Sequence, residues 1–130
     1  MPTASSSKHI LNIAYDTSLM DSRESILTSA GYRVESVNRK QDVLKHVLAT
    51  KFSLVLIGHS VPAPEREDLI VLIRACDRFI PIAFVAPRTD SQSCASADMT
   101  IASHPADLLK GVSEATTEPW AVGDALTLKQ

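Results

Sequence analysis

The sequence contains few of the residues from which metal, redox and nucleic-acid sites are usually built. Only two of its 130 residues are cysteines, Cys76 and Cys94, and their separation matches neither a CxxC motif nor a zinc site. Lysine and arginine total 13 against 15 acidic residues, so the basic excess of a nucleic-acid-binding domain is missing. We therefore expect neither a structural metal nor a nucleic-acid partner.

The sequence also has no long apolar segment. No run approaches the roughly 20 residues that span a bilayer, and the polar start MPTASSSK is unlike a signal peptide. These features predict a cytoplasmic protein without a membrane partner. Because cytoplasmic thiols stay reduced, no disulfide is expected. Cys76 is predicted to be buried on an apolar helical stripe, and Cys94 to be exposed in a polar segment.

Apolar residues are nevertheless plentiful enough for a folded core. They make up 45% of the sequence, and a chain of this length predicts one domain. Short apolar or alternating runs, typical of β-strands, recur along the chain. The predicted strands cover residues 9–15, 32–37, 54–57, 80–86 and 100–103.

Segments with helical periodicity lie between these runs, and the predicted helices cover residues 16–31, 38–51, 63–79 and 106–114. Capping-box spacing marks the starts of the first two, at Ser18/Asp21 and Asn38/Gln41. Gly31 suits the C-terminal cap of the first helix. The third should bury an apolar face made of Leu69, Leu72, Ile73 and Cys76.

Regular alternation of strand and helix predicts an α/β fold, a doubly wound parallel five-stranded sheet with helices on both faces. The polar segment PRTDSQSCASADM, residues 87–99, has almost no apolar stripe, so the fourth helix is expected to be shortened or missing. The domain should cover residues 9–115, between a flexible arm (1–8) and a C-terminal tail (116–130).

Four stretches, in this order and spacing, carry a family resemblance: ILNIAYDTSLMDSRESILTSAGYRV, FSLVLIGHSVP, PIAFVA and ADMTIASHP. Over roughly residues 8–115 the chain resembles the receiver domain of bacterial two-component response regulators, which has a flavodoxin-like (βα)5 fold. The resemblance implies a site at the carboxyl ends of the strands. There an aspartate accepts a phosphoryl group, an acidic pair holds Mg²⁺, and a lysine and a Ser/Thr contact the phosphate.

This sequence departs from the family pattern at each of those positions. The acceptor position holds Gly58, which has no nucleophile. The acidic pair falls on Ala14 and Tyr15, the Ser/Thr on Ala86 and the lysine on His104. The aromatic switch of the fifth strand falls on Ile101. The resemblance therefore implies a degenerate pseudo-receiver without catalytic residues.

A receiver fold without its acceptor implies an atypical response regulator domain, a phosphorylation-independent protein-interaction module in signal transduction. We expect no enzymatic activity and no cofactor. Because no output domain is evident in the sequence, the output should pass through a signalling protein or through a homodimer.

Two other functions are weighed against this one. Asp16, His59 and His104 could converge at the strand ends as a small-ligand or metal site, since imidazole and carboxylate suit zinc or nickel. A catalyst built on Ser60 beside His59 is the least favoured, because adjacency does not give nucleophile–base geometry and no GxSxG elbow is present. A flavin site is disfavoured, because no phosphate-binding loop follows the first strand.

A shortened fourth helix should also leave part of the sheet bare, near Ile82, Phe84 and Ile101. Apolar surface of that kind is usually covered. The cover could be the C-terminal tail, which contains Trp120, or the same face of a twofold partner. We therefore predict a homodimer.

Overall fold

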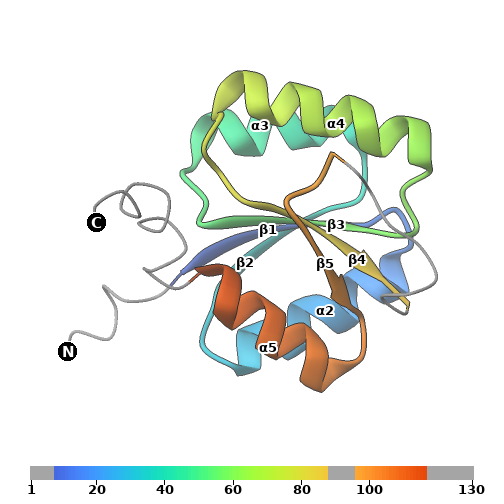
Figure 1. Cartoon of the computed structure of the whole chain (residues 1–130), viewed down its shortest axis with the longest axis vertical. Coiled ribbons are helices and arrows are strands. Elements are labelled where there is room, and N and C mark those ends of the chain that lie inside the picture. Colours follow the sequence, from blue (N-terminus) through green and yellow to red (C-terminus); the bar gives the residue numbers. More distant parts are fainter. Residues whose placement is uncertain (1–7, 88–95, 117–130) are drawn as a thin grey trace, which may run out of the picture.

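The computed structural model describes residues 8–87 and 96–116, which form one parallel five-stranded sheet with helices on both faces (Figure 1). The strand order is β2-β1-β3-β4-β5, which confirms the predicted doubly wound, flavodoxin-like fold. The strands are β1 (His9–Ile13), β2 (Arg33–Val37), β3 (Leu54–Gly58), β4 (Ile82–Ala86) and β5 (Met99–Ala102). The described residues contain four helices: α2 (Thr17–Ser29), α3 (Lys40–Ala49), α4 (Ala63–Cys76) and α5 (Pro105–Thr116).

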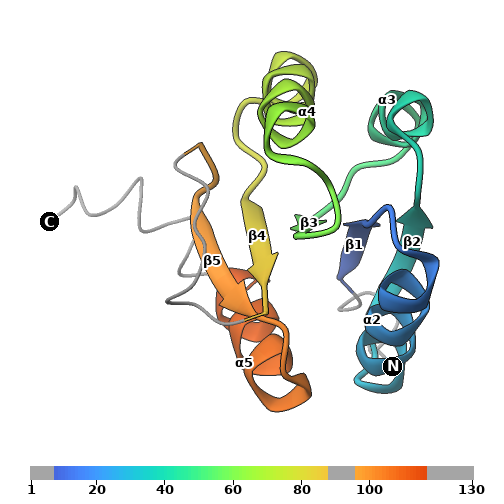
Figure 2. The same ribbon diagram turned by 90° about the vertical axis from the view of Figure 1, so that its right-hand side faces the viewer.

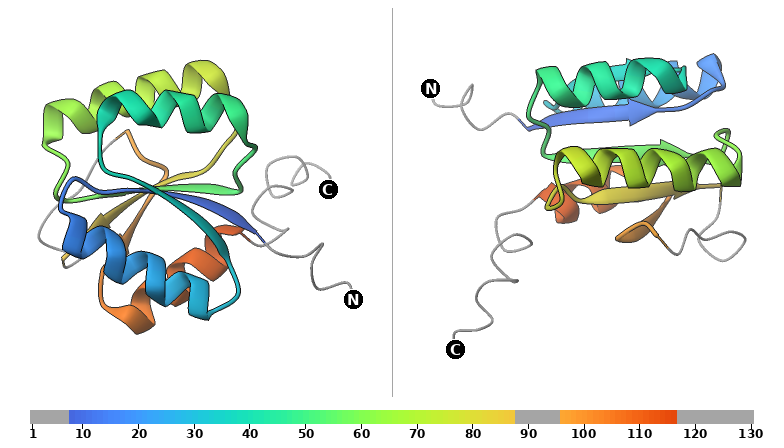
Figure 3. Two further views of the ribbon diagram at one scale, coloured as in Figure 1. Left: turned by 180° about the vertical axis from the view of Figure 1, so that it is seen from behind. Right: turned by 90° about the horizontal axis from the view of Figure 1, so that it is seen from above.

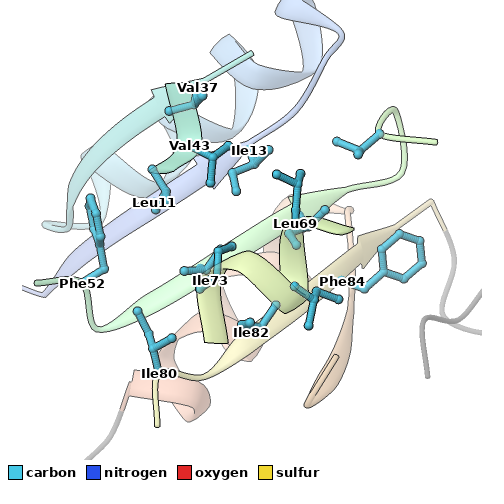
Figure 4. Close-up of a cluster of buried hydrophobic side chains, with 14 of the residues drawn as sticks. Leu11, Ile13, Val37, Val43, Phe52, Leu69, Ile73, Ile80, Ile82 and Phe84 are labelled. Atoms are coloured by element: carbon cyan, nitrogen blue, oxygen red, sulfur yellow. The ribbon is translucent and has the colours of Figure 1, made fainter. Parts of the chain in front are cut away.

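The helices divide between the two faces of the sheet. Figures 1 and 2 show α3 and α4 on one face and α2 and α5 on the other, and α3 and α4 run side by side when seen from above (Figure 3). Every residue of the central strand β3 is buried, as the nearly continuous apolar run Leu54–Gly58 predicts for a strand covered on both sides. Alternate residues of the strands belong to two apolar clusters, one on each face of the sheet. Figure 4 shows the cluster beneath α3 and α4.

The first two helices begin elsewhere than the capping pattern predicts. Asp16, not Ser18, caps α2, because its carboxylate accepts hydrogen bonds from the backbone N–H groups of Ser18 and Leu19 at 2.9 and 3.1 Å. Helix α3 begins at Lys40, with Arg39 instead of the predicted Asn38 at the N-cap position and without a side-chain cap. The predicted role of Gly31 is consistent with its φ of +100°, which favours glycine.

The buried face of α4 also differs from the predicted stripe. It consists of Arg66, Leu69, Ile70 and Ile73, whereas Leu72 and Cys76 are exposed. The prediction of a buried Cys76 thiol is therefore wrong. Arg66 occupies the first inward position of the helix, where its aliphatic stem can pack like an apolar side chain.

The predicted bare patch of the sheet is absent from the described part of the chain. Ile82 and Phe84 are fully buried, and the guanidinium of Arg66 lies over the Phe84 ring at 4.4 Å from its centroid. Ile101 is 5% exposed and belongs to the cluster on the opposite face, beneath α5. These residues thus form no shared surface that requires a cover.

Other predictions concern segments outside the described residues. Between β4 and β5 the structure contains no helix in Pro87 or in residues 96–98, and residues 88–95, including Cys94, lie outside the description. The same holds for nearly all of the predicted arm and tail, including Trp120. None of the helices described is both long and apolar enough to cross a membrane.

Candidate functional site at the carboxyl ends of the strands

The parallel sheet brings the predicted site positions to one edge. Ala14 follows β1 directly, Gly58 ends β3, and Ala86 ends β4. The register pairs Ile13 with Ile57 and Gly58 with the residue before Ala86, so the ends of the three strands are neighbours. Ala14, Gly58 and Ala86 are all buried and carry no side-chain oxygen.

Tyr15 connects this edge to α4. Its hydroxyl donates a hydrogen bond to Oε1 of Glu65 at 2.6 Å. Burial, followed by the hydrogen bond and the charge of Glu65, raises the pKa of Tyr15 above its ordinary value, so the tyrosine stays a neutral donor. A residue that stands where the resemblance implies a metal-binding acid therefore ties two elements together.

Ser60 ties together the loops that follow β1 and β3. Its hydroxyl oxygen accepts hydrogen bonds from the backbone N–H groups of Tyr15 and Asp16, at 2.9 and 3.1 Å. Through these bonds Ser60 connects the two loops. They give no support to the alternative in which Ser60 is a nucleophile activated by His59.

The three candidate ligand residues do not assemble a metal site in the described part of the chain. No cluster there brings together three or more His, Cys, Asp or Glu side chains that could hold an ion. Asp16 is occupied as the cap of α2. His104 is exposed just before α5, where its backbone carbonyl accepts a hydrogen bond from Leu108 at 2.8 Å.

Arg23 of α2 fills the space beside Gly58. A Cβ at position 58 would overlap Nη1 of Arg23 and lie 3.3 Å from its Cζ. The arginine is only 2% exposed, and its buried Nη1 and Nη2 have no hydrogen-bond partner among the described residues. Burial lowers the pKa of Arg23, and the charge of Asp16 opposes this shift. A cation thus stands where a side chain at the acceptor position would begin.

A second buried arginine contributes to the positive charge of this edge. Nη1 of Arg66 donates to the carbonyl of Val61 at 2.8 Å, directly after the Gly58 corner. The pKa of His59 is lowered, first by burial and then by the charges of Arg23 and Arg66, with Asp16 acting in the opposite direction. The edge therefore combines two buried arginines with the carboxylates of Asp16 and Glu65, whereas the resemblance implies an acidic Mg²⁺ pocket without such cations.

Sequence reasoning missed both arginines. Each occupies a helical position in register with buried residues: Arg23 is four residues before Leu27, and Arg66 is three residues before Leu69. Since arginine is rarely buried without a partner, a search for apolar stripes passes over it. Including arginine stems in the helical pattern would have found both.

Among the comparisons with known proteins, solved structures alone resemble this chain. No family model matches the sequence, and no curated protein is found as a relative. Among solved structures, a CheY-like response regulator receiver domain protein from Methanospirillum hungatei JF-1 is 26% identical, with a TM-score of 0.71 over 84% of this chain and 93% of that one. Chemotaxis protein CheY4 of Vibrio cholerae is 18% identical, with a TM-score of 0.74 over 85% of this chain and 99% of that one.

A third similar structure is the receiver domain of a sensor histidine kinase from Pseudomonas aeruginosa PAO1, which has magnesium coordinated in its active-site cleft. It is 17% identical, with a TM-score of 0.70 over 85% of this chain and 98% of that one. The match nearly spans each of these receiver domains. The chain therefore has the fold of CheY-like response regulator receiver domains.

Proposed function

We propose that this protein is a pseudo-receiver, a cytoplasmic, non-enzymatic interaction module of signal transduction that works without phosphorylation. The observation that carries the proposal is the position of Arg23, whose guanidinium occupies the space beside Gly58. The receiver fold is present, and the corner where a phosphoryl acceptor is expected holds a glycine and a buried cation.

The electrostatics of this edge oppose the metal that receiver chemistry requires. Mg²⁺ is bound by oxygen ligands, usually carboxylates. Ala14, Gly58 and Ala86 supply no side-chain oxygen, and Asp16 already caps a helix. A divalent cation would also be repelled by Arg23 and Arg66, and repulsion between charges is stronger in a buried site than in water.

We further propose that the output passes through contacts with a signalling protein or a second copy of this chain. Apart from the sheet-forming core, the described surface carries four large exposed hydrophobic residues: Leu48, Val71, Leu72 and Phe79. They come from α3, from α4 and from the segment after α4. These four residues are separate from the part of the sheet around Phe84 that was predicted to be bare, and which is buried.

A magnesium titration followed by heteronuclear NMR tests the proposal. We expect the amide resonances of Tyr15, Asp16, His59 and Ser60 to show no saturable shift with MgCl₂, compared with KCl at equal ionic strength. The Gly58→Asp variant should also show none, because the acidic pair is still missing. Saturable magnesium binding to the wild-type chain at these residues would refute the proposal.

A further inference from the structure

We infer that the strand-end edge holds a small oxyanion, a phosphate or a carboxylate, bound by the guanidinium of Arg23. This goes beyond the proposed function, because a domain that is never phosphorylated does not need an anion site. It also differs from receiver chemistry, since the positive charge comes from an arginine of α2 and no covalent bond forms.

Arg23 has no hydrogen-bond partner for its terminal nitrogens among the described residues. The side chain is 2% exposed, and its two terminal nitrogens are buried without a hydrogen-bond acceptor in the described part of the chain. Guanidinium stays protonated in proteins, and an unpaired buried charge is strongly destabilising. Buried polar groups in native proteins almost always have a partner. An acceptor from outside the chain would supply it.

Two buried arginines place their charges at this corner. Arg66 and Arg23 both lower the pKa of His59, so both charges act on the same corner. Asp16 is the carboxylate that opposes them, but its Oδ1 already accepts hydrogen bonds from Ser18 and Leu19. Because Asp16 is engaged with the backbone, and Glu65 accepts the hydrogen bond of Tyr15, neither carboxylate pairs with the buried nitrogens of Arg23. An oxyanion would supply those nitrogens with both an acceptor and a negative charge.

The guanidinium of Arg23 has a shape that suits an oxyanion, and the loops above it are partly exposed. The planar guanidinium fork presents parallel N–H groups that fit the oxygens of a carboxylate or a phosphate. Tyr15, His59 and Ser60, in the loops that close this edge, are only partly buried. In this inference, a small oxyanion would reach Arg23 through these loops rather than through the sheet.

Thermal unfolding of the full chain near neutral pH tests this inference. Potassium phosphate and potassium acetate are compared with potassium chloride at matched ionic strength, which controls for charge screening. Phosphate also stabilises folded proteins by exclusion from their surface, and the Arg23 variant below controls for that effect. At concentrations well above Kd, we expect the favoured oxyanion to raise Tm by at least about 3 °C. The phosphate and acetate arms show which of the two oxyanions is bound. Equal Tm in all three salts would overturn the inference.

Variants show whether Arg23 is the ligand. Arg23→Met keeps an unbranched apolar stem and should abolish the oxyanion-dependent rise in Tm, whereas Arg33→Met, at an exposed arginine on β2, should retain it. Gly58→Asp should also abolish the rise, because the new carboxylate would sit against Arg23 and replace the free anion. An undiminished rise in Gly58→Asp, or in a folded Arg23→Met, would contradict the assignment.

A spectroscopic readout does not depend on the folding of any variant. In the wild-type chain, the side-chain Nε–H resonance of Arg23 should shift saturably with the oxyanion, and that of Arg33 should not. Identical behaviour of the two resonances would overturn the inference. Magnesium binding would refute the proposed function and leave this result unaffected, so the two failures are distinguishable.

Discussion

Gly58 leaves room for Arg23 because it has no side chain. Any Cβ at this position would overlap Nη1 of the arginine, so the guanidinium would have to move aside. The arginine is the flexible partner in this contact, but it is only 2% exposed and has little room to move. The two residues are therefore coupled. The buried guanidinium fits at this corner because position 58 is a glycine.

Gly58→Ala tests this coupling. In the wild-type background we expect the free energy of unfolding to fall by about 1–3 kcal/mol, the usual effect of overpacking a buried site. In an Arg23→Met background the loss should be clearly smaller, because the thioether chain can bend away. Urea unfolding of the four proteins in this double-mutant cycle gives the coupling energy. An equal loss in both backgrounds would show that the two positions are independent.

His59 makes the stability of the domain dependent on pH. Its pKa in the folded chain lies below the ordinary value of 6.5, so the fold favours the neutral imidazole. The associated stability is fully present above 6.5 and is lost as the pH falls through the folded pKa. We expect His59→Gln to be less sensitive to acid than the wild-type chain over this range. His104→Gln, at an exposed histidine, serves as the control and should unfold like the wild type. If His59→Gln and the wild type were equally sensitive to acid, the prediction would be contradicted.

Helix α5 approaches β5 closely at one residue. A Cβ at Gly111 would lie 2.8 Å from Cγ1 and Cγ2 of Ile101, a side chain that is 5% exposed and cannot move freely. The glycine thus sets the distance between the helix and the sheet, and Ile101, which is predicted to stand at the family's switch position, is held beneath it.

Gly111→Ala should destabilise the domain although alanine favours helix. The gain in helix propensity is about 0.5–1 kcal/mol, and the overpacking against Ile101 costs about 1–3 kcal/mol. We expect a net loss near 1 kcal/mol in urea unfolding. Ser113→Ala, at an exposed position of the same helix, should be neutral or slightly stabilising. If both variants were stabilised alike, the contact with Ile101 would not restrict the size of the residue at position 111.

The elements could be predicted from the sequence more fully than the site. Strand β3 was predicted to within one residue, because its run of branched and aliphatic residues is bounded by Ser53 and the Gly58 corner. The rotation of α4 was not predictable from apolar residues alone, since it depends on Arg66 packing against Phe84, a contact distant in sequence. Arg23 was missed for the same reason: its burial depends on the absence of a side chain at Gly58, on another element.

The oligomeric state of the whole molecule remains a prediction. The sequence predicted a homodimer because part of the sheet was expected to lack a cover. Ile82 and Phe84, which were expected to lie in that uncovered part, are buried within one chain. The exposed Leu48, Val71 and Phe79 now give the main support. We expect sedimentation equilibrium to show a dimer that Val71→Glu weakens, and Ser113→Glu, on α5, does not. A monomer at all concentrations would contradict the homodimer.

The whole domain is interpreted as a receiver fold that has lost phosphoryl transfer and holds a buried arginine beside the acceptor position. The most direct test is the intact mass of the wild-type chain after incubation with acetyl phosphate and Mg²⁺. A phosphorylation-competent receiver domain treated in parallel is the positive control. We predict no phosphoryl adduct on the wild-type chain and none on Gly58→Asp, which still lacks the acidic pair and the lysine. A phosphoryl group on the wild-type chain would contradict the account.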